Sequence, residues 1–231
     1  MLNKPEIMKI KTIISLFCLS ALPSHAALVN LSNWGAENWS ANAGNWDVQP
    51  GNTQVRQTKN GNPTVFLSDQ SAVGTNIQGK IKVGANSDND FVGFVLGFDS
   101  GDFADPSADF LLIDWKQGNQ SGADMGLAVS RVTGVVPTAD PGFWEHTSGV
   151  SELARGATLG STGWVDNVEY TFDFSFSATN LQVSVDGVPQ ININGNFSGG
   201  NFGFYNYSQS DVRYSGFTQD PLPPPVNAGW S

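Results

Sequence analysis

Cysteine is almost absent from this chain of 231 residues. The single cysteine, Cys18, lies inside a short apolar run, and Phe17 stands before it where a lipoprotein requires a small residue. This excludes lipid attachment at Cys18 and leaves the rest of the chain without a disulfide. An exported protein without disulfides is more typical of bacteria than of animals.

Basic residues are also scarce. The chain has 11 Lys and Arg against 21 Asp and Glu, and its formal net charge is −10 at pH 7. A chain this acidic repels phosphate backbones, so we expect no nucleic-acid partner. With one cysteine and two histidines, the sequence also offers too few nitrogen and sulfur ligands for a zinc site.

No apolar run is long enough to span a bilayer. The run at residues 13–22 has only about half of the ~20 residues needed. It follows Lys9 and Lys11, and small residues lead to Ala26. These features predict a signal peptide at residues 1–26, cleaved after Ala26. We therefore expect a secreted protein, with the cell surface and the periplasm as alternatives, and no transmembrane segment in the mature chain.

Helical patterns are rare, whereas short strands recur. Residues 77–83 alternate apolar and polar side chains, as in a half-exposed strand. Tyr170, Phe172, Phe174 and Phe176 share one face of another expected strand. The sequence also predicts strands at residues 64–69, 90–98, 109–115 and 125–134, a hairpin at Asp186-Gly187, and a short helix within residues 149–158.

The spacing of these strands, roughly every 10 to 15 residues with turn signals between them, predicts an all-β fold. We expect an antiparallel β-sandwich of jelly-roll type at residues 27–218. The proline-rich residues 219–231 are expected to form an extended, disordered tail outside the domain. Trp34, Trp39 and Trp46 lie among turn residues, and we interpret them as core plugs, with a sugar-stacking platform as the alternative.

Acidic and amide residues stand directly before one of the most apolar strands. Asn86, Asp88 and Asp90 alternate ahead of the strand that begins at Phe91. In an extended segment alternate side chains point the same way, and calcium takes oxygen ligands of this type. The pattern is not an EF-hand loop. It predicts a calcium site, and a solvated turn without metal is the alternative.

Several motifs resemble the C-terminal domain of thrombospondins, in the same order along the chain. They include "DNDFVGFVLGF", "FLLIDWKQ", "FWEHTSG" and "GGNFGFYNYSQSDVRYSGF", and the resemblance runs from about residue 30 to residue 218. It implies a concanavalin A-like, laminin G-like jelly roll that binds calcium and serves extracellular binding or adhesion, here as a stand-alone exported bacterial domain. Asp88 and Asp90 match the acidic cluster of that family, and Asp211 matches an acid near its end. The repeats, EGF modules and disulfide cysteines of thrombospondins are absent, so their matrix function does not carry over.

Enzymatic chemistry is disfavoured by the placement of the acids. Retaining glycoside hydrolases need two carboxylates about 5 Å apart, and the best pair here is Glu169 and Asp173, which share a strand face. His146, without a G-x-S-x-G motif nearby, is interpreted as a structural or surface residue. We therefore expect a non-catalytic, calcium-binding, lectin-like module whose partner is a carbohydrate or an extracellular surface protein. The alternatives are a glycan-active hydrolase of the same fold and a non-catalytic structural protein of the cell surface or matrix.

Overall fold

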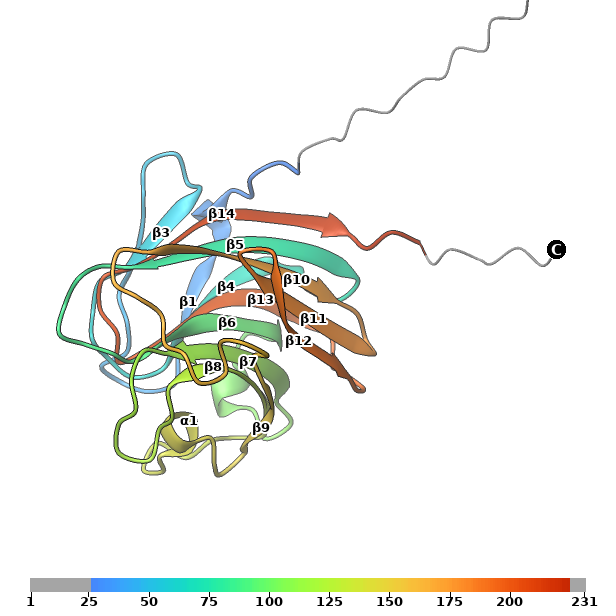
Figure 1. Ribbon diagram of the computed structural model, residues 1–231. Helices are drawn as coiled ribbons and strands as arrows, with labels where there is room; N and C mark the ends of the chain where they lie inside the picture. The colour runs from blue at the N-terminus through green and yellow to red at the C-terminus, as the bar shows by residue number, and fades with distance from the viewer. Residues whose placement is uncertain (1–25, 225–231) are drawn as a thin grey trace, which may run out of the picture.

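The computed structural model describes residues 26–224, which form two antiparallel sheets of seven strands each (Figure 1). The first sheet contains, in spatial order, β1 (Gly35–Asn38), β4 (Thr64–Ser71), β13 (Asn201–Tyr207), β6 (Phe91–Phe98), β7 (Asp109–Lys116), β8 (Gly126–Thr133) and β9 (Val150–Arg155). The second contains β12 (Val188–Asn194), β11 (Asn180–Val185), β10 (Glu169–Phe176), β5 (Thr75–Val83), β14 (Val212–Pro221), β3 (Gln54–Gln57) and β2 (Trp46–Val48). The predicted all-β antiparallel sandwich is confirmed.

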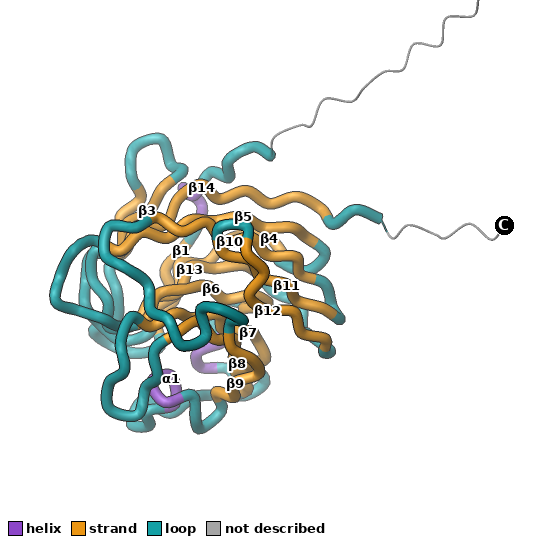
Figure 2. The backbone as a smooth tube through the Cα atoms, in the orientation of Figure 1, coloured by secondary structure: helices purple, strands orange, loops and turns teal. Residues whose placement is uncertain are grey.

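Within residues 26–224, helix is limited to three short pieces, and loops gather at the ends of the strands (Figure 2). The helical pieces are η1 (Leu31–Asn33), η2 (Asp102–Ala104) and α1 (Gly142–Glu145). The predicted short helix within residues 149–158 is wrong, because Val150 and Ser151 pair with β8 and begin the edge strand β9. No helix within residues 26–224 is both long enough and apolar enough to cross a bilayer.

The main core lies between the two sheets. The predicted aromatic face of β10 points into it, where Phe172 and Phe174 are almost fully buried. Their ring centroids lie 5.0 and 4.9 Å from that of Phe94 on β6 in the opposite sheet. Burial of each such side chain contributes about 1.5–3 kcal/mol relative to exposure, so these aromatic contacts hold the two sheets together.

A second apolar cluster covers the outer face of the first sheet. There Phe91, Val95 and Phe98 of β6 pack in a group that includes Phe143 of α1. Every residue of β6 is therefore buried, whichever face it occupies. This explains why the strand reads as a continuous apolar run without polar alternation.

The tryptophans near the N-terminus serve the packing of the sandwich. Trp34 is 7% exposed, and its ring centroid lies 5.1 Å from Phe204 and 5.0 Å from Phe217. Trp46, which is half-buried, stacks on Phe66 at 5.5 Å. The interpretation as core plugs is confirmed for Trp34 and Trp46, whereas Trp39 is partly buried and packs on the second cluster, 5.4 Å from Phe143.

The described residues bear differently on the predicted signal peptide and the predicted tail. Residues 1–25, which hold almost all of the predicted signal peptide, and residues 225–231 lie outside the described part. Residues 219–221, which the sequence places in the tail, continue β14 instead, with Gln219 opposite Ile77 and Asp220 opposite Asn76 of β5. Pro221 ends the strand, a position where the missing N–H of proline is tolerated.

Candidate functional site

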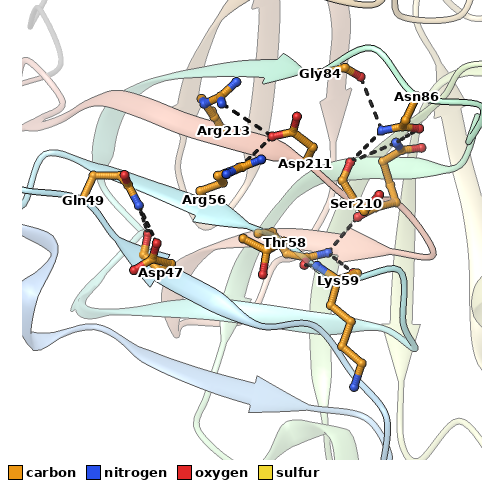
Figure 3. A network of polar contacts seen from close by, with 12 residues as sticks. Asp47, Gln49, Arg56, Thr58, Lys59, Gly84, Asn86, Ser210, Asp211 and Arg213 are labelled. Carbon is orange, nitrogen blue, oxygen red and sulfur yellow. Dashed lines mark hydrogen bonds and ion pairs between the residues drawn. The ribbon is translucent and has the colours of Figure 1, made fainter.

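The acidic loop joins the end of β5 to the start of β6, and Asn86 fastens it. The Oδ1 atom of Asn86 accepts hydrogen bonds from the backbone N–H of Asp88 (2.8 Å) and from Nε2 of Gln209 (3.2 Å). Its Nδ2 donates to the carbonyl oxygen of Ser210 (3.1 Å), a contact drawn in Figure 3. The first bond is the short-range turn contact that Asn favours. Asn86 thereby ties the loop to the segment between β13 and β14.

Asp90 is buried and forms an ion pair with Lys116. The carboxylate is 4% exposed and the lysine side chain is fully buried, and Asp90 Oδ1 lies 2.7 Å from Lys116 Nζ. The backbone of Asp90 is also held, because its N–H donates to Oε1 of Gln209 and its carbonyl oxygen accepts from Nε1 of Trp164. A buried charge requires such a partner.

Lys116 reaches this position because β7 pairs with β6, which places Lys116 opposite Phe91. Besides Asp90, its ammonium group meets the carbonyl oxygen of Asn89 and Oε1 of Gln120, both at 3.2 Å. Three acceptors thus serve its three protons. The ring of Trp144 lies 4.5 Å from Nζ and adds a cation–π contact.

Asp88 lies beside Asp90 and is less buried. Its Oδ2 accepts a hydrogen bond from Nδ2 of Asn60. Burial and the neighbouring Asp90 carboxylate raise the pKa of Asp88 above its usual range, while Asn60 and Lys116 act in the opposite direction. Although Lys116 already faces Asp90, the Asp90 carboxylate still disfavours the charged form of Asp88. A bound divalent cation would favour that charged form.

Asp211 faces arginines. Its Oδ1 lies 2.7 Å from Nε of Arg56 and 3.7 Å from Nη2 of Arg213 (Figure 3). The structure thus brings Asn86, Asp88 and Asp90 together in one loop, whereas the Asp211 carboxylate is engaged in an ion pair.

A second group of acids follows β6, at the opposite end of that strand. The length of β6 separates the two loops by roughly 25 Å, so they do not converge. In the second loop Asp102 accepts a hydrogen bond from the backbone N–H of Asp99 (2.8 Å). Asp109, the first residue of β7, pairs with Arg131 through both carboxylate oxygens (2.6 Å each). These acids cap the loop and pair with arginine.

A calcium ion takes six to eight oxygen ligands. Within residues 26–224, no three Asp, Glu, His or Cys side chains converge in a way that could hold a metal. The acidic loop offers two adjacent carboxylates, each with one oxygen engaged by Asn60 or Lys116. The other oxygen of each carboxylate could bind a hard cation, whose remaining ligands would have to be backbone carbonyls and water.

The residues weighed for catalysis are engaged elsewhere. Glu169 pairs with Lys80 at 2.8 Å, and Asp173 accepts a hydrogen bond from Gln78 at 2.7 Å. Both carboxylates thus take part in contacts between the neighbouring strands β5 and β10.

His146 takes part in an arrangement that the sequence does not reveal. Its Nε2 lies 3.0 Å from Oδ2 of Asp114, and its Nδ1 lies 3.4 Å from Oγ of Ser130 and 3.6 Å from Glu152. Burial opposes protonation, but the Asp114 and Glu152 carboxylates outweigh it and raise the pKa of His146 to about 9. His146 directly follows α1, so these contacts link the end of α1 to β7, β8 and β9.

Comparison with known proteins finds a family similarity over part of this chain. Residues 41–134 match the thrombospondin C-terminal region. The resemblance inferred from the motifs is confirmed over that stretch, which contains the acidic loop. Thrombospondin-4 of Bos taurus and of Mus musculus are each 27% identical to this chain over 140 residues. That alignment covers 54% of this chain but only 14% of each thrombospondin-4.

Solved structures share the sandwich fold at low sequence identity. A carbohydrate-binding module of Bacillus subtilis, CBM66, aligns with a TM-score of 0.54 and 14% identity over 80% of this chain and 95% of its own. The exoplasmic domain of VIP36, solved with Ca²⁺ and a mannose-containing glycan, aligns with a TM-score of 0.54 and 15% identity over 84% of this chain and 87% of its own. At these identities the likeness concerns the β-sandwich fold alone.

Three residues of the candidate site were missed by sequence reasoning: Lys116, Gln209 and Asn60. Lys116 leaves a signal, since it is the one basic residue of β7, whose other residues are apolar except for Asp109 and Asp114. Gln209 and Asn60 leave none, because they reach the loop from distant segments.

Proposed function

We propose that this protein is an exported, non-catalytic, lectin-like module that binds carbohydrate outside the cell with the help of calcium. The fold carries the carbohydrate part of this proposal. CBM66 and VIP36 are carbohydrate-binding or glycan-bound proteins by their own descriptions, and their sandwiches superpose on most of this chain.

The calcium part is supported by Asp88 and Asp90. Their carboxylates are adjacent, and the pKa of Asp88 is raised by burial and by Asp90. A calcium ion there would supply positive charge that relieves this repulsion and would pin the loop to the start of β6. Asn86 would keep the loop in place. Asp211 is left out of this proposal because Arg56 engages its carboxylate.

The binding function is tested on a glycan array with the secreted protein, in 1 mM calcium and in EDTA. We expect retention of a subset of glycans in calcium and reduced retention in EDTA. Absence of binding to every glycan in calcium would refute the carbohydrate function and favour a surface protein as the partner.

The metal site is tested separately by thermal and chemical unfolding. A Kd of about 10⁻⁴ M for calcium is common for extracellular modules. At about 1 mM calcium, an ion that binds only the folded state with this Kd raises the free energy of unfolding by roughly 1.4 kcal/mol. Asp88→Asn should remove this gain while Asp90 keeps its partner Lys116. Asp69→Asn, at an exposed position of β4, is the matched control and should keep it. Equal stability of the wild-type protein in calcium and in EDTA would show that the loop is a solvated turn.

A further inference from the structure

A groove of about 670 Å³ crosses the outer face of the second sheet. It lies over β5, β10 and β11, which are neighbouring strands (Figure 1), and it extends onto β12 and the second half of β14. Its volume lies within the range of roughly 300–1,000 Å³ that is typical of small-molecule sites. Neither the acidic loop nor the His146 group contributes to its walls.

The groove is hollow for local reasons. The outward side chains on its floor are short or of medium length, such as Ser175, Ser184 and Asn76. The strand pairings on both sides are irregular, with a register shift between Val183 and Ser184 and another between Ser215 and Thr218. Bulges of this kind bend and twist the strand that carries them and are frequent next to binding sites.

Hydrogen-bonding groups dominate the side chains that point into the groove. Asp173 lies at the middle strand and accepts from Nε2 of Gln78 (2.7 Å) and from Oγ of Ser184 (3.3 Å). Its carboxylate has lone pairs left for further donors. The carboxamides of Asn76 and Gln182 can both donate and accept. A ligand whose own groups do both would match this floor.

The charge of the groove narrows the class of ligand. Among the described residues that line it, none is Lys, Arg or His, whereas Asp173 and Asp220 are present. Lys80, two residues along β5 from Gln78, is paired with Glu169 at 2.8 Å. Anionic ligands are repelled here, and a ligand rich in hydroxyl groups is favoured.

We propose that this groove binds a neutral oligosaccharide, with Asp173, Gln78 and Gln182 as its principal hydrogen-bonding residues. This inference rests on the proposed carbohydrate function and gives it a location. The only aromatic side chain in the lining, Phe174, is 2% exposed and points into the core. Hydrogen bonds rather than ring stacking must therefore supply the affinity. Loss of a single polar group should then weaken binding measurably.

The experiment titrates hexasaccharides into the full secreted protein by calorimetry, with calcium held at 1 mM throughout. The neutral probes are hexasaccharides of glucose, mannose, galactose and xylose. The anionic probes are heparin-derived and galacturonate hexasaccharides. We expect binding of at least one neutral probe and of neither anionic probe.

Two variants locate the site on the probe that binds the wild-type protein best. Asp173→Asn keeps the size of the side chain and should weaken binding about tenfold, as expected when a charged hydrogen-bond partner is lost. Ser175→Trp should fill the groove and abolish binding. Ser151→Trp, on the exposed edge strand β9, is the matched control and should bind like the wild type. The melting temperature of each variant reports that it is folded.

The outcomes separate the two proposals. Binding of a neutral probe that survives both groove variants would overturn the groove and leave the carbohydrate function standing. Preferential binding of an anionic probe would overturn the neutral ligand class. Binding of no probe, in agreement with an empty glycan array, would overturn the carbohydrate function together with the groove.

Discussion

At the scale of single residues, Lys116 and Asp90 form an ion pair that water does not reach. The pair explains why a carboxylate stands at the start of a core strand. The ammonium group of Lys116 lies 2.7 Å from Asp90 Oδ1, and the lysine side chain is itself fully buried. Buried pairs of this kind contribute little net stability when intact, but they are costly to break from one side.

Lys116→Met should therefore destabilise the protein by about 3–5 kcal/mol, because it leaves the Asp90 carboxylate buried without a counterion. The free energy of unfolding in urea measures this change. Arg56→Met is the control, since its pair with Asp211 is partly exposed and should contribute at most about 1 kcal/mol. Equal losses in the two variants would contradict the account.

His146 should give the protein a dependence on alkaline pH. Its folded pKa of about 9 lies above the ordinary value of 6.5. A histidine with a raised folded pKa contributes its full stability below the unfolded pKa and loses it as the pH rises through the folded pKa. Between pH 7 and pH 10 we expect the free energy of unfolding of the wild-type protein to fall by up to roughly 3 kcal/mol more than that of His146→Gln.

The direct measurement is an NMR titration of the His146 ring, which is the only histidine beyond residue 26. A midpoint near 9 would agree with the cluster formed by Asp114 and Glu152. A midpoint near 6.5 would show that these carboxylates do not hold the imidazolium in solution.

At the scale of elements, the hairpin between β11 and β12 depends on a left-handed turn. Asp186 has φ 50° and Gly187 has φ 75°. The structure leaves open space around a β-carbon at Gly187, so the only cost of a side chain there is conformational. This hairpin also forms one end of the groove, because Gly187 and Pro189 line it.

Gly187→Ala should lower the free energy of unfolding by about 1–2 kcal/mol, because a residue with a side chain is strained in the left-handed conformation. Gly35→Ala is the matched control, since Gly35 also has open space but no positive φ. It should be neutral or slightly stabilising, because alanine restricts the unfolded chain. Thermal unfolding of the two variants side by side tests this, and equal losses would argue against the turn geometry.

At the scale of the whole molecule, the first sheet is covered on both faces, whereas the second keeps an open outer face that carries the groove. Loops and α1 cover the outer face of the first sheet through Phe143 and its neighbours. This asymmetry leaves the second sheet as the face available to an extended ligand. It also accounts for the purely apolar sequence of β6 and the alternating sequence of β5.

Export is a prediction for the whole chain. The basic start at Lys9 and Lys11, the apolar run and the small residues before Ala27 lead us to expect a mature protein that begins at Ala27 or within a residue or two of it. Mass spectrometry of protein from the culture medium and the periplasm checks this. Protein found only inside cells with an intact Met1 would rule it out.

The sequence by itself determined the β-sandwich, its aromatic core face and the Asp186-Gly187 hairpin. These features depend on alternation and on turn residues, which are local properties of the chain. The family resemblance added the concanavalin A-like type of jelly roll and pointed to the acidic loop.

Only the tertiary structure decided what the acids do. Asp90 meets Lys116 from β7, Asp211 meets Arg56 from β3, and His146 meets Asp114 from β7. The groove likewise exists only where β5, β10 and β11 lie side by side. The reason is that antiparallel register brings together residues that are far apart in the chain. A shift of one residue would turn Lys116, Asp114 and Arg56 to the other face of their sheets.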